Sequence, residues 1–89
     1  MIRESITIIN KLGLHARASA KLNNVAQQYV CSVLIEKQGQ QADAKSIMSL
    51  MMLDASKGTE VMIEVDGEDE LEALMALKEL INNRFDEGE

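Results

Sequence analysis

Four short stretches of the chain alternate hydrophobic with polar residues, and each alternation predicts a strand that buries one face. They cover residues 2–9, 31–36, 41–44 and 60–65. Gln38-Gly39-Gln40 stands between the second and third stretches and predicts a hairpin turn. Asp66-Gly67 predicts another turn directly after the fourth stretch.

Three further stretches space their hydrophobic residues by three or four positions, which is typical of helices with one buried face. The first helix is predicted over residues 16–28, the second begins at the N-cap Ser46 and ends near Leu53, and the third follows residues 68–70, whose acidic side chains suit a helix N-terminus. The apolar stripe of the third helix comprises Leu71, Leu74, Leu77 (or the stem of Lys78), Ile81 and Phe85. We expect residues 86–89 to form a frayed end.

The resulting order, β-α-β-β-α-β-α, predicts an α+β open-faced sandwich in which helices cover one face of a four-stranded sheet. With 89 residues, the chain has room for one small domain, which we place over residues 1–89. Hydrophobic residues make up 46% of it, enough to bury a core without disulfides or metals. Ferredoxin-like domains share much of this order, so the pattern alone leaves both architectures open.

The charge of the chain restricts its partners. Its formal net charge is -6, and Tyr29 and Phe85 are its only aromatic residues apart from the histidine ring. Nucleic acid or an anionic membrane surface would require a basic face, and base stacking would require aromatic platforms, so we expect neither partner. Cys31 is the single cysteine, which excludes an internal disulfide, favours a cytoplasmic location and is typical of a small buried residue.

The only histidine lies in the segment Gly13-Leu14-His15-Ala16-Arg17, between the first predicted strand and the first predicted helix. A helix N-terminus exposes N–H groups without partners, and its dipole favours anions. A neutral imidazole there offers a ring nitrogen as nucleophile, and the backbone of Ala16 and Arg17 offers donors. Because the cation of Arg17 opposes the dipole, we interpret it as a ligand for an anion. By position alone, a histidine at a helix start is more often a cap or a surface residue.

The predicted second helix is apolar at nearly every position. Its spacing assigns Leu50 and Leu53 to the core and leaves Ile47, Met48 and Met51 partly exposed. Exposed methionines form an adaptable surface for several partners. From the sequence alone, burial of all these side chains is an equally good interpretation.

Two of these segments together resemble a known family. Gly13-Leu14-His15-Ala16-Arg17 is similar to the active-site segment of the HPr phosphocarriers of the bacterial phosphotransferase system, and residues 44–53 are similar to the regulatory-serine segment of that family. Both segments stand in the family order at a family-like separation, and the resemblance runs over about residues 5–85. The family commonly continues the histidine motif with proline and then alanine, where this chain has Ala18 and Ser19. Alanine is a good helix former, so this departure leaves the chemistry intact.

The resemblance implies an antiparallel sheet covered by three helices. It also implies a phosphocarrier that accepts a phosphoryl group on Nδ1 of His15 from Enzyme I and passes it to an Enzyme IIA domain. Ser46 is then a site of regulatory phosphorylation by a serine kinase/phosphorylase, although an N-cap serine needs no other purpose.

Docking is expected to combine the apolar residues Ile47, Met48 and Met51 with modest electrostatics from Lys21. The chain contains no nucleotide cradle and no metal-ligand cluster, so we expect neither cofactor nor metal. These expectations describe a monomeric, stoichiometric carrier rather than an autonomous enzyme.

Two other hypotheses stay open. The first is a regulatory docking module of the nitrogen-related branch of the same family, to which residues 51–58 have some similarity. The second is a ferredoxin-like sensor, which would require a pocket for a small molecule and would carry no phosphohistidine.

Overall fold

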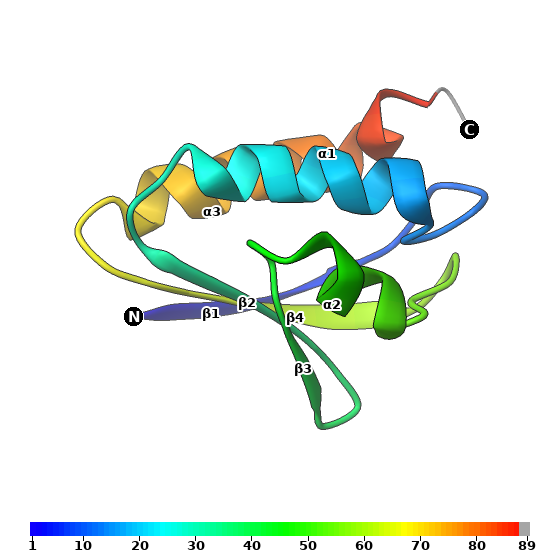
Figure 1. Ribbon diagram of the computed structural model, residues 1–89, viewed down its shortest axis with the longest axis horizontal. Helices are drawn as coiled ribbons and strands as arrows, with labels where there is room; N and C mark the ends of the chain where they lie inside the picture. The colour runs from blue at the N-terminus through cyan, green and yellow to red at the C-terminus, as the bar shows by residue number, and fades with distance from the viewer. Residues whose placement is uncertain (88–89) are drawn as a thin grey trace.

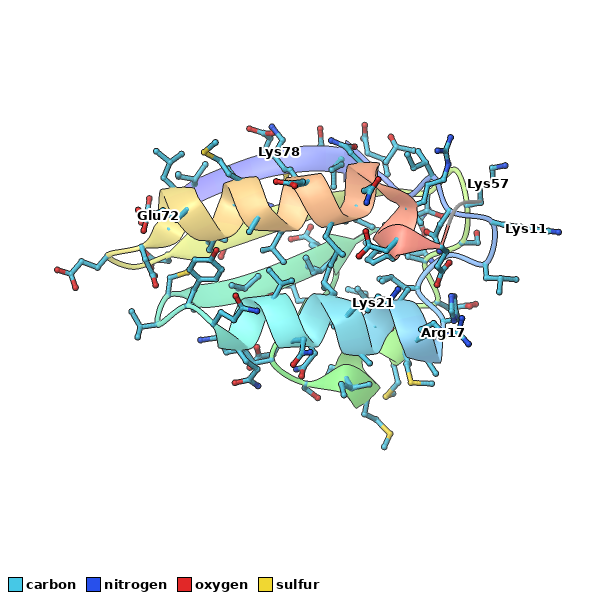
Figure 2. The ribbon with its side chains drawn as sticks, turned by 90° about the horizontal axis from the view of Figure 1, so that it is seen from above. Lys11, Arg17, Lys21, Lys57, Glu72 and Lys78 are labelled. Carbon is cyan, nitrogen blue, oxygen red and sulfur yellow. The ribbon has the colours of Figure 1, made fainter. Side chains whose placement is uncertain are left out.

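The computed structural model describes residues 1–87, in which four antiparallel strands form one sheet and three helices pack over one of its faces (Figure 1). In chain order the elements are β1 (Ile2–Thr7), α1 (Ala16–Gln27), β2 (Ser32–Lys37), β3 (Gln40–Asp43), α2 (Ile47–Met52), β4 (Glu60–Asp66), α3 (Glu70–Asn82) and the 3-10 turn η1 (Arg84–Asp86). Helices α1 and α3 lie side by side, and α2 packs against α1 and β3 (Figure 2). The predicted α+β open-faced sandwich is therefore confirmed.

The sheet has the order β1-β4-β2-β3, and every neighbouring pair is antiparallel. Alternation along β4 follows burial, because Val61, Ile63 and Val65 face the helices and the residues between them face away. Val65 pairs with Ile2 on one side and with Val33 on the other, so that β-branched side chains meet across three strands. The hydrophobic residues of the predicted alternation in β4 thus lie on the core face of the sheet.

Helix α1 buries one face and satisfies the polar group on it. Its buried residues are Ala18, Ser19, Leu22 and Ala26. The hydroxyl of Ser19 donates a hydrogen bond of 3.2 Å to the carbonyl of Leu14, so this buried polar group has a partner. None of the helices within residues 1–87 has the length and apolar character needed to cross a membrane.

Two details of the predicted last helix are wrong. Leu71 is 57% exposed, because the buried face of α3 is centred on Leu74, Leu77 and their neighbours and Leu71 lies at its edge. The helix also ends at Asn82 instead of continuing through Phe85. Phe85 is nevertheless fully buried, as expected, because the chain turns back toward the core after α3.

This reversal is a short left-handed turn. Arg84, Phe85 and Asp86 have φ angles of 53°, 53° and 60°, and such a conformation costs an L-residue about 1–2 kcal/mol. Burial of the Phe85 ring in the core offsets part of this cost. The expectation of a frayed end is therefore wrong for Asp86 and Glu87, which the turn holds in place, and its remaining part, residues 88–89, lies outside the described residues.

Asp69 joins the start of α3 to the chain between α1 and β2. Its carboxylate accepts hydrogen bonds from the N–H groups of Val30 (2.9 Å) and Cys31 (3.0 Å), and its side chain does not cap its own helix. The bond from Val30, followed by that from Cys31, holds the pKa of the Asp69 carboxyl below its ordinary value. Cys31 is buried, as expected, and burial raises the pKa of its thiol.

Candidate functional site

The loop between β1 and α1 fixes the position of His15. Gly13 has a φ of +66°, and a Cβ atom added to it would lie 2.3 Å from the carbonyl oxygen of Ala55. The neighbouring Leu14 N–H donates a 2.8 Å hydrogen bond to that same oxygen. Only glycine permits both the left-handed backbone and the close approach. The loop is therefore held against the segment before β4 and delivers His15 to the start of α1.

His15 is the N-cap of α1, and its two ring nitrogens have different partners. Nδ1 accepts a hydrogen bond of 3.3 Å from the N–H of Arg17, and Nε2 lies 2.6 Å from Oε2 of Glu87. Because an ionised carboxylate can only accept, Nε2 carries the hydrogen and Nδ1 carries the lone pair. This tautomer makes Nδ1 the nucleophilic atom of the ring. The His15 side chain is 27% exposed, which leaves it accessible to a partner.

A hollow of about 560 Å³ opens beside the imidazole. Besides His15, its lining residues are Lys11, Leu12, Ala16, Arg17, Lys21, Asp86 and Glu87. Arg17 is exposed in this hollow, and within residues 1–87 its guanidinium makes no ion pair. Figure 2 shows Arg17 and Lys21 on α1 and Lys11 on the loop before it. An anion bound near Nδ1 would therefore meet the N-terminus of α1 in a hollow that these cations line together with Asp86 and Glu87.

Lys21 holds the end of the chain as well as lining the hollow. Its ammonium donates a 2.6 Å hydrogen bond to the carbonyl of Phe85. The sequence analysis placed Lys21 in the docking surface, and that role stays a prediction. The contact adds a structural role that no local pattern could indicate, since 64 positions separate the two residues.

Glu87 is the member of this site that sequence reasoning missed. Besides contacting His15, its Oε1 accepts a 3.1 Å hydrogen bond from Nδ2 of Asn10, which also donates to the carbonyl of Gly13. Burial raises the pKa of the Glu87 carboxyl, but the hydrogen bonds from Asn10 and His15 and the charge of Lys21 outweigh this and hold it below the ordinary value. The contact is consequently present at neutral pH and is lost only as the pH falls through this lowered pKa.

The short helix α2 exposes an apolar surface, which we name the α2 patch: Ile47, Met48, Met51 and Met52. Leu50 and Leu53 are buried, so the predicted division of this helix into core and exposed residues is confirmed. Met52, at 71% exposed, was not in the predicted set. Because α2 packs against α1, the patch stands on the helix next to the one that His15 opens.

Ser46 is the N-cap of α2, as predicted. Its hydroxyl accepts a 3.3 Å hydrogen bond from the N–H of Ser49. The side chain is half-buried and directly precedes the α2 patch. Within residues 1–87, no three His, Cys, Asp or Glu side chains converge in a way that would hold a metal ion.

Carrying a phosphoryl group on histidine requires a free ring nitrogen, donors for the phosphoryl oxygens and an accessible surface for partner proteins. The fold and the site provide all three, and they define the class of small histidine phosphocarriers. A family model described as "PTS HPr component phosphorylation site" matches residues 2–83. The chain belongs to the HPr family of the phosphotransferase system, which confirms the resemblance seen in the sequence.

The relatives agree with this assignment over at least 97% of their length. "Phosphocarrier protein HPr" of Cupriavidus necator is 57% identical over 89 residues, which cover 100% of both chains. "Phosphocarrier protein NPr" of Klebsiella oxytoca is 42% identical over 87 residues and 97% of each chain. The crystal structure of an HPr from Thermoanaerobacter tengcongensis, 40% identical, matches with a TM-score of 0.94 over 98% of each chain.

Proposed function

We propose that this protein accepts a phosphoryl group on Nδ1 of His15 from Enzyme I and passes it to an Enzyme IIA domain. The observation that carries the proposal is the tautomer of His15, which leaves the lone pair on Nδ1 while Nε2–H faces Glu87. In the transfer the Nδ1 lone pair forms a bond to phosphorus. The bond between phosphorus and the donor atom breaks, and the donor keeps its electron pair. The reverse sequence delivers the group to the acceptor, so the protein is a stoichiometric carrier.

The helix start and Arg17 would bind the transferred group. The N–H of Arg17 already points at Nδ1 in the free protein, so it is placed to donate to a phosphoryl oxygen once Nδ1 is occupied. The guanidinium of Arg17 is exposed and can supply a charge-assisted hydrogen bond to the same group. The α2 patch would provide the apolar contact for two successive partners.

The experiment that tests the proposal is incubation with Enzyme I and labelled phosphoenolpyruvate. We expect one phosphoryl group per chain and a product that is labile in acid, as a phosphoramidate bond is. Transfer of the label to sugar-specific Enzyme IIA domains, compared with a nitrogen-type one, would identify the branch. The carbohydrate branch is favoured because the relative with the name HPr is 57% identical and the one with the name NPr is 42% identical. The cytoplasmic location and the monomeric state stay predictions.

Replacing Arg17 by alanine should slow phosphoryl transfer with little loss of stability. Loss of a charge-assisted hydrogen bond to the phosphoryl oxygens removes roughly 1.5–3 kcal/mol at that step, which corresponds to about 10- to 100-fold in rate. Rapid-quench kinetics of transfer from Enzyme I would measure the effect. Arg17→Lys is the matched control, since it keeps the charge and loses the planar fork. Transfer by Arg17→Ala at the rate of the unmodified protein would show that backbone donors alone suffice.

Replacing Ser46 by aspartate should weaken transfer from Enzyme I without melting the domain. Aspartate is a good N-cap and its charge suits the helix dipole, so the thermal midpoint should hold or rise slightly. Bringing a carboxylate under an apolar partner surface costs about 1–3 kcal/mol, so transfer should slow by about fivefold or more.

Thermal melts and transfer kinetics should be run on one preparation, with Ser46→Asn as the neutral capping control. A melting point several degrees lower, or transfer at the original rate, would identify Ser46 as a structural cap. The proposed regulation by a serine kinase/phosphorylase would then fail.

A further inference from the structure

The turn that follows α3 brings a carboxylate against the far nitrogen of the histidine. Oε2 of Glu87 lies 2.6 Å from Nε2 of His15, although 72 positions separate the two residues. The Glu87 side chain is only 12% exposed. A contact this short, with the carboxylate largely removed from solvent, is much better defined than a surface ion pair.

Three separate interactions hold Glu87 in this position. The ring of Phe85 anchors the turn in the core, and the Lys21 ammonium binds the Phe85 carbonyl. Asn10, itself fully buried, donates from Nδ2 to the other oxygen of Glu87 and to the carbonyl of Gly13. The turn adopts left-handed backbone angles that are unfavourable for residues other than glycine. An unfavourable backbone held from several sides indicates that the position of the carboxylate has a use.

We propose that Glu87 is a positioning residue for phosphoryl transfer, which holds His15 in the Nε2–H tautomer and stabilises the positive charge that the ring gains when Nδ1 takes up the phosphoryl group. This inference rests on the proposed function and assigns a further residue to the same site. The relation of carboxylate to imidazole is that of the third member of a catalytic triad, which orients the ring and does not itself take the proton.

The charge balance of the step shows why a carboxylate helps. Before transfer the ring is neutral, with its hydrogen on Nε2 and its lone pair on Nδ1. When Nδ1 forms the bond to phosphorus, the ring becomes a cation, because the Nε2 hydrogen remains. Glu87 accepts that hydrogen bond in both states. Its negative charge stabilises a positive ring only in the product, because the ring is neutral before transfer. It therefore favours transfer to His15 more than it favours the resting state.

The groups around the pair suit this role. Arg17 and Lys21 of α1 and Lys11 of the preceding loop line the hollow and are placed to balance the phosphoryl charge. Asp86 lies on the same wall but binds Asn83, so Glu87 is the carboxylate that meets the imidazole. Glu87 is thus the carboxylate on Nε2, in a hollow that is also lined by three cationic residues and Asp86.

Replacement of Glu87 by glutamine tests the inference. With its oxygen kept on Nδ2 of Asn10, the glutamine amide presents an N–H group to Nε2 and favours hydrogen on Nδ1, where the Arg17 N–H already points. ¹⁵N NMR of the His15 ring distinguishes the two tautomers directly. We expect Glu87→Gln to lose the uniform Nε2–H tautomer and to slow transfer from Enzyme I by about 10- to 100-fold, the range found when the carboxylate that orients a metal-bound histidine is removed.

Glu72→Gln is the matched control, because it removes the same charge from the exposed, opposite end of α3 (Figure 2). It should change neither the tautomer nor the rate. Glu87→Asp keeps the charge on a shorter side chain and should recover part of the rate. Melting curves of all variants establish that each is folded at the temperature of the NMR and kinetic measurements.

An unchanged tautomer in Glu87→Gln, or a changed tautomer with an unchanged rate, would overturn the inference. These outcomes differ from failure of the proposed function. If the proposed function fails, the unmodified protein takes no phosphoryl group, whereas the tautomer of its free histidine can still be measured.

Discussion

Replacement of His15 by asparagine should abolish phosphoryl acceptance and leave the fold intact. His15 is the single histidine of the sequence, and Nδ1 is the atom that carries the available lone pair. Asparagine is among the best N-caps and can accept the hydrogen bond from the Arg17 N–H, so the start of α1 keeps its partner. The expected effect is complete loss of the labelled product rather than a slower rate.

The measurement is mass spectrometry after incubation with Enzyme I and phosphoenolpyruvate, alongside a thermal melt. His15→Ala is the comparison variant, because it removes the cap as well and should cost about 1 kcal/mol of stability. An undiminished gain of one phosphoryl group by a folded His15→Asn protein would sink the assignment of the acceptor. A phosphoryl group that the unmodified protein takes from Enzyme I on Ser46 alone would also contradict the assignment of His15 as the acceptor.

Replacement of Phe85 by alanine should lower the free energy of unfolding by about 3–5 kcal/mol, the largest stability loss that we expect from a single substitution. Phe85 is the largest of the fully buried side chains and packs into the main core cluster. Its removal leaves a cavity and also takes away the anchor of a backbone turn that is unfavourable on its own. The site should respond as well, since Glu87 follows Phe85 by two residues.

Urea denaturation would give the change in the free energy of unfolding, provided that its dependence on urea concentration is the same in the variant and the unmodified protein. Phe85→Leu fills most of the space and should lose clearly less stability than Phe85→Ala. A loss below about 1 kcal/mol for Phe85→Ala would show that the turn does not depend on core packing. Because the loss is large relative to the stability of a small domain, the titration should be made at low temperature.

The features that the sequence predicted correctly depend on residues that are close together in the chain. Alternation in residues 60–65 gives burial directly, because successive side chains of a strand face opposite sides. Ser46 was identified as an N-cap, and Leu50 was assigned to the core of α2, from spacing within a single turn of helix. His15 could be placed at a helix start for the same reason.

The features that the sequence did not predict depend on residues that meet only in the folded chain. Glu87 lies in a charged terminal stretch whose composition is typical of a frayed end, and nothing local indicates that it reaches His15. The left-handed turn before it contains no glycine in residues 84–86, so the usual signal for such a backbone is missing. Asp69 belongs to the acidic residues predicted to suit a helix N-terminus, yet its carboxylate binds the backbone of Val30 and Cys31.

Gly13 has a consequence for experiments that read function from libraries of single substitutions. Any side chain at this position meets the carbonyl oxygen of Ala55 and forces an unfavourable φ, so the loop that carries the histidine must shift. A growth selection based on phosphotransfer would therefore reject variants at positions 13 and 15 alike. The two intolerances have different origins, one in the space between two backbones and the other in the chemistry of a ring nitrogen. The substitutions tolerated in such a selection would therefore depend on the backbone geometry of the loop as strongly as on the identity of the phosphoryl acceptor.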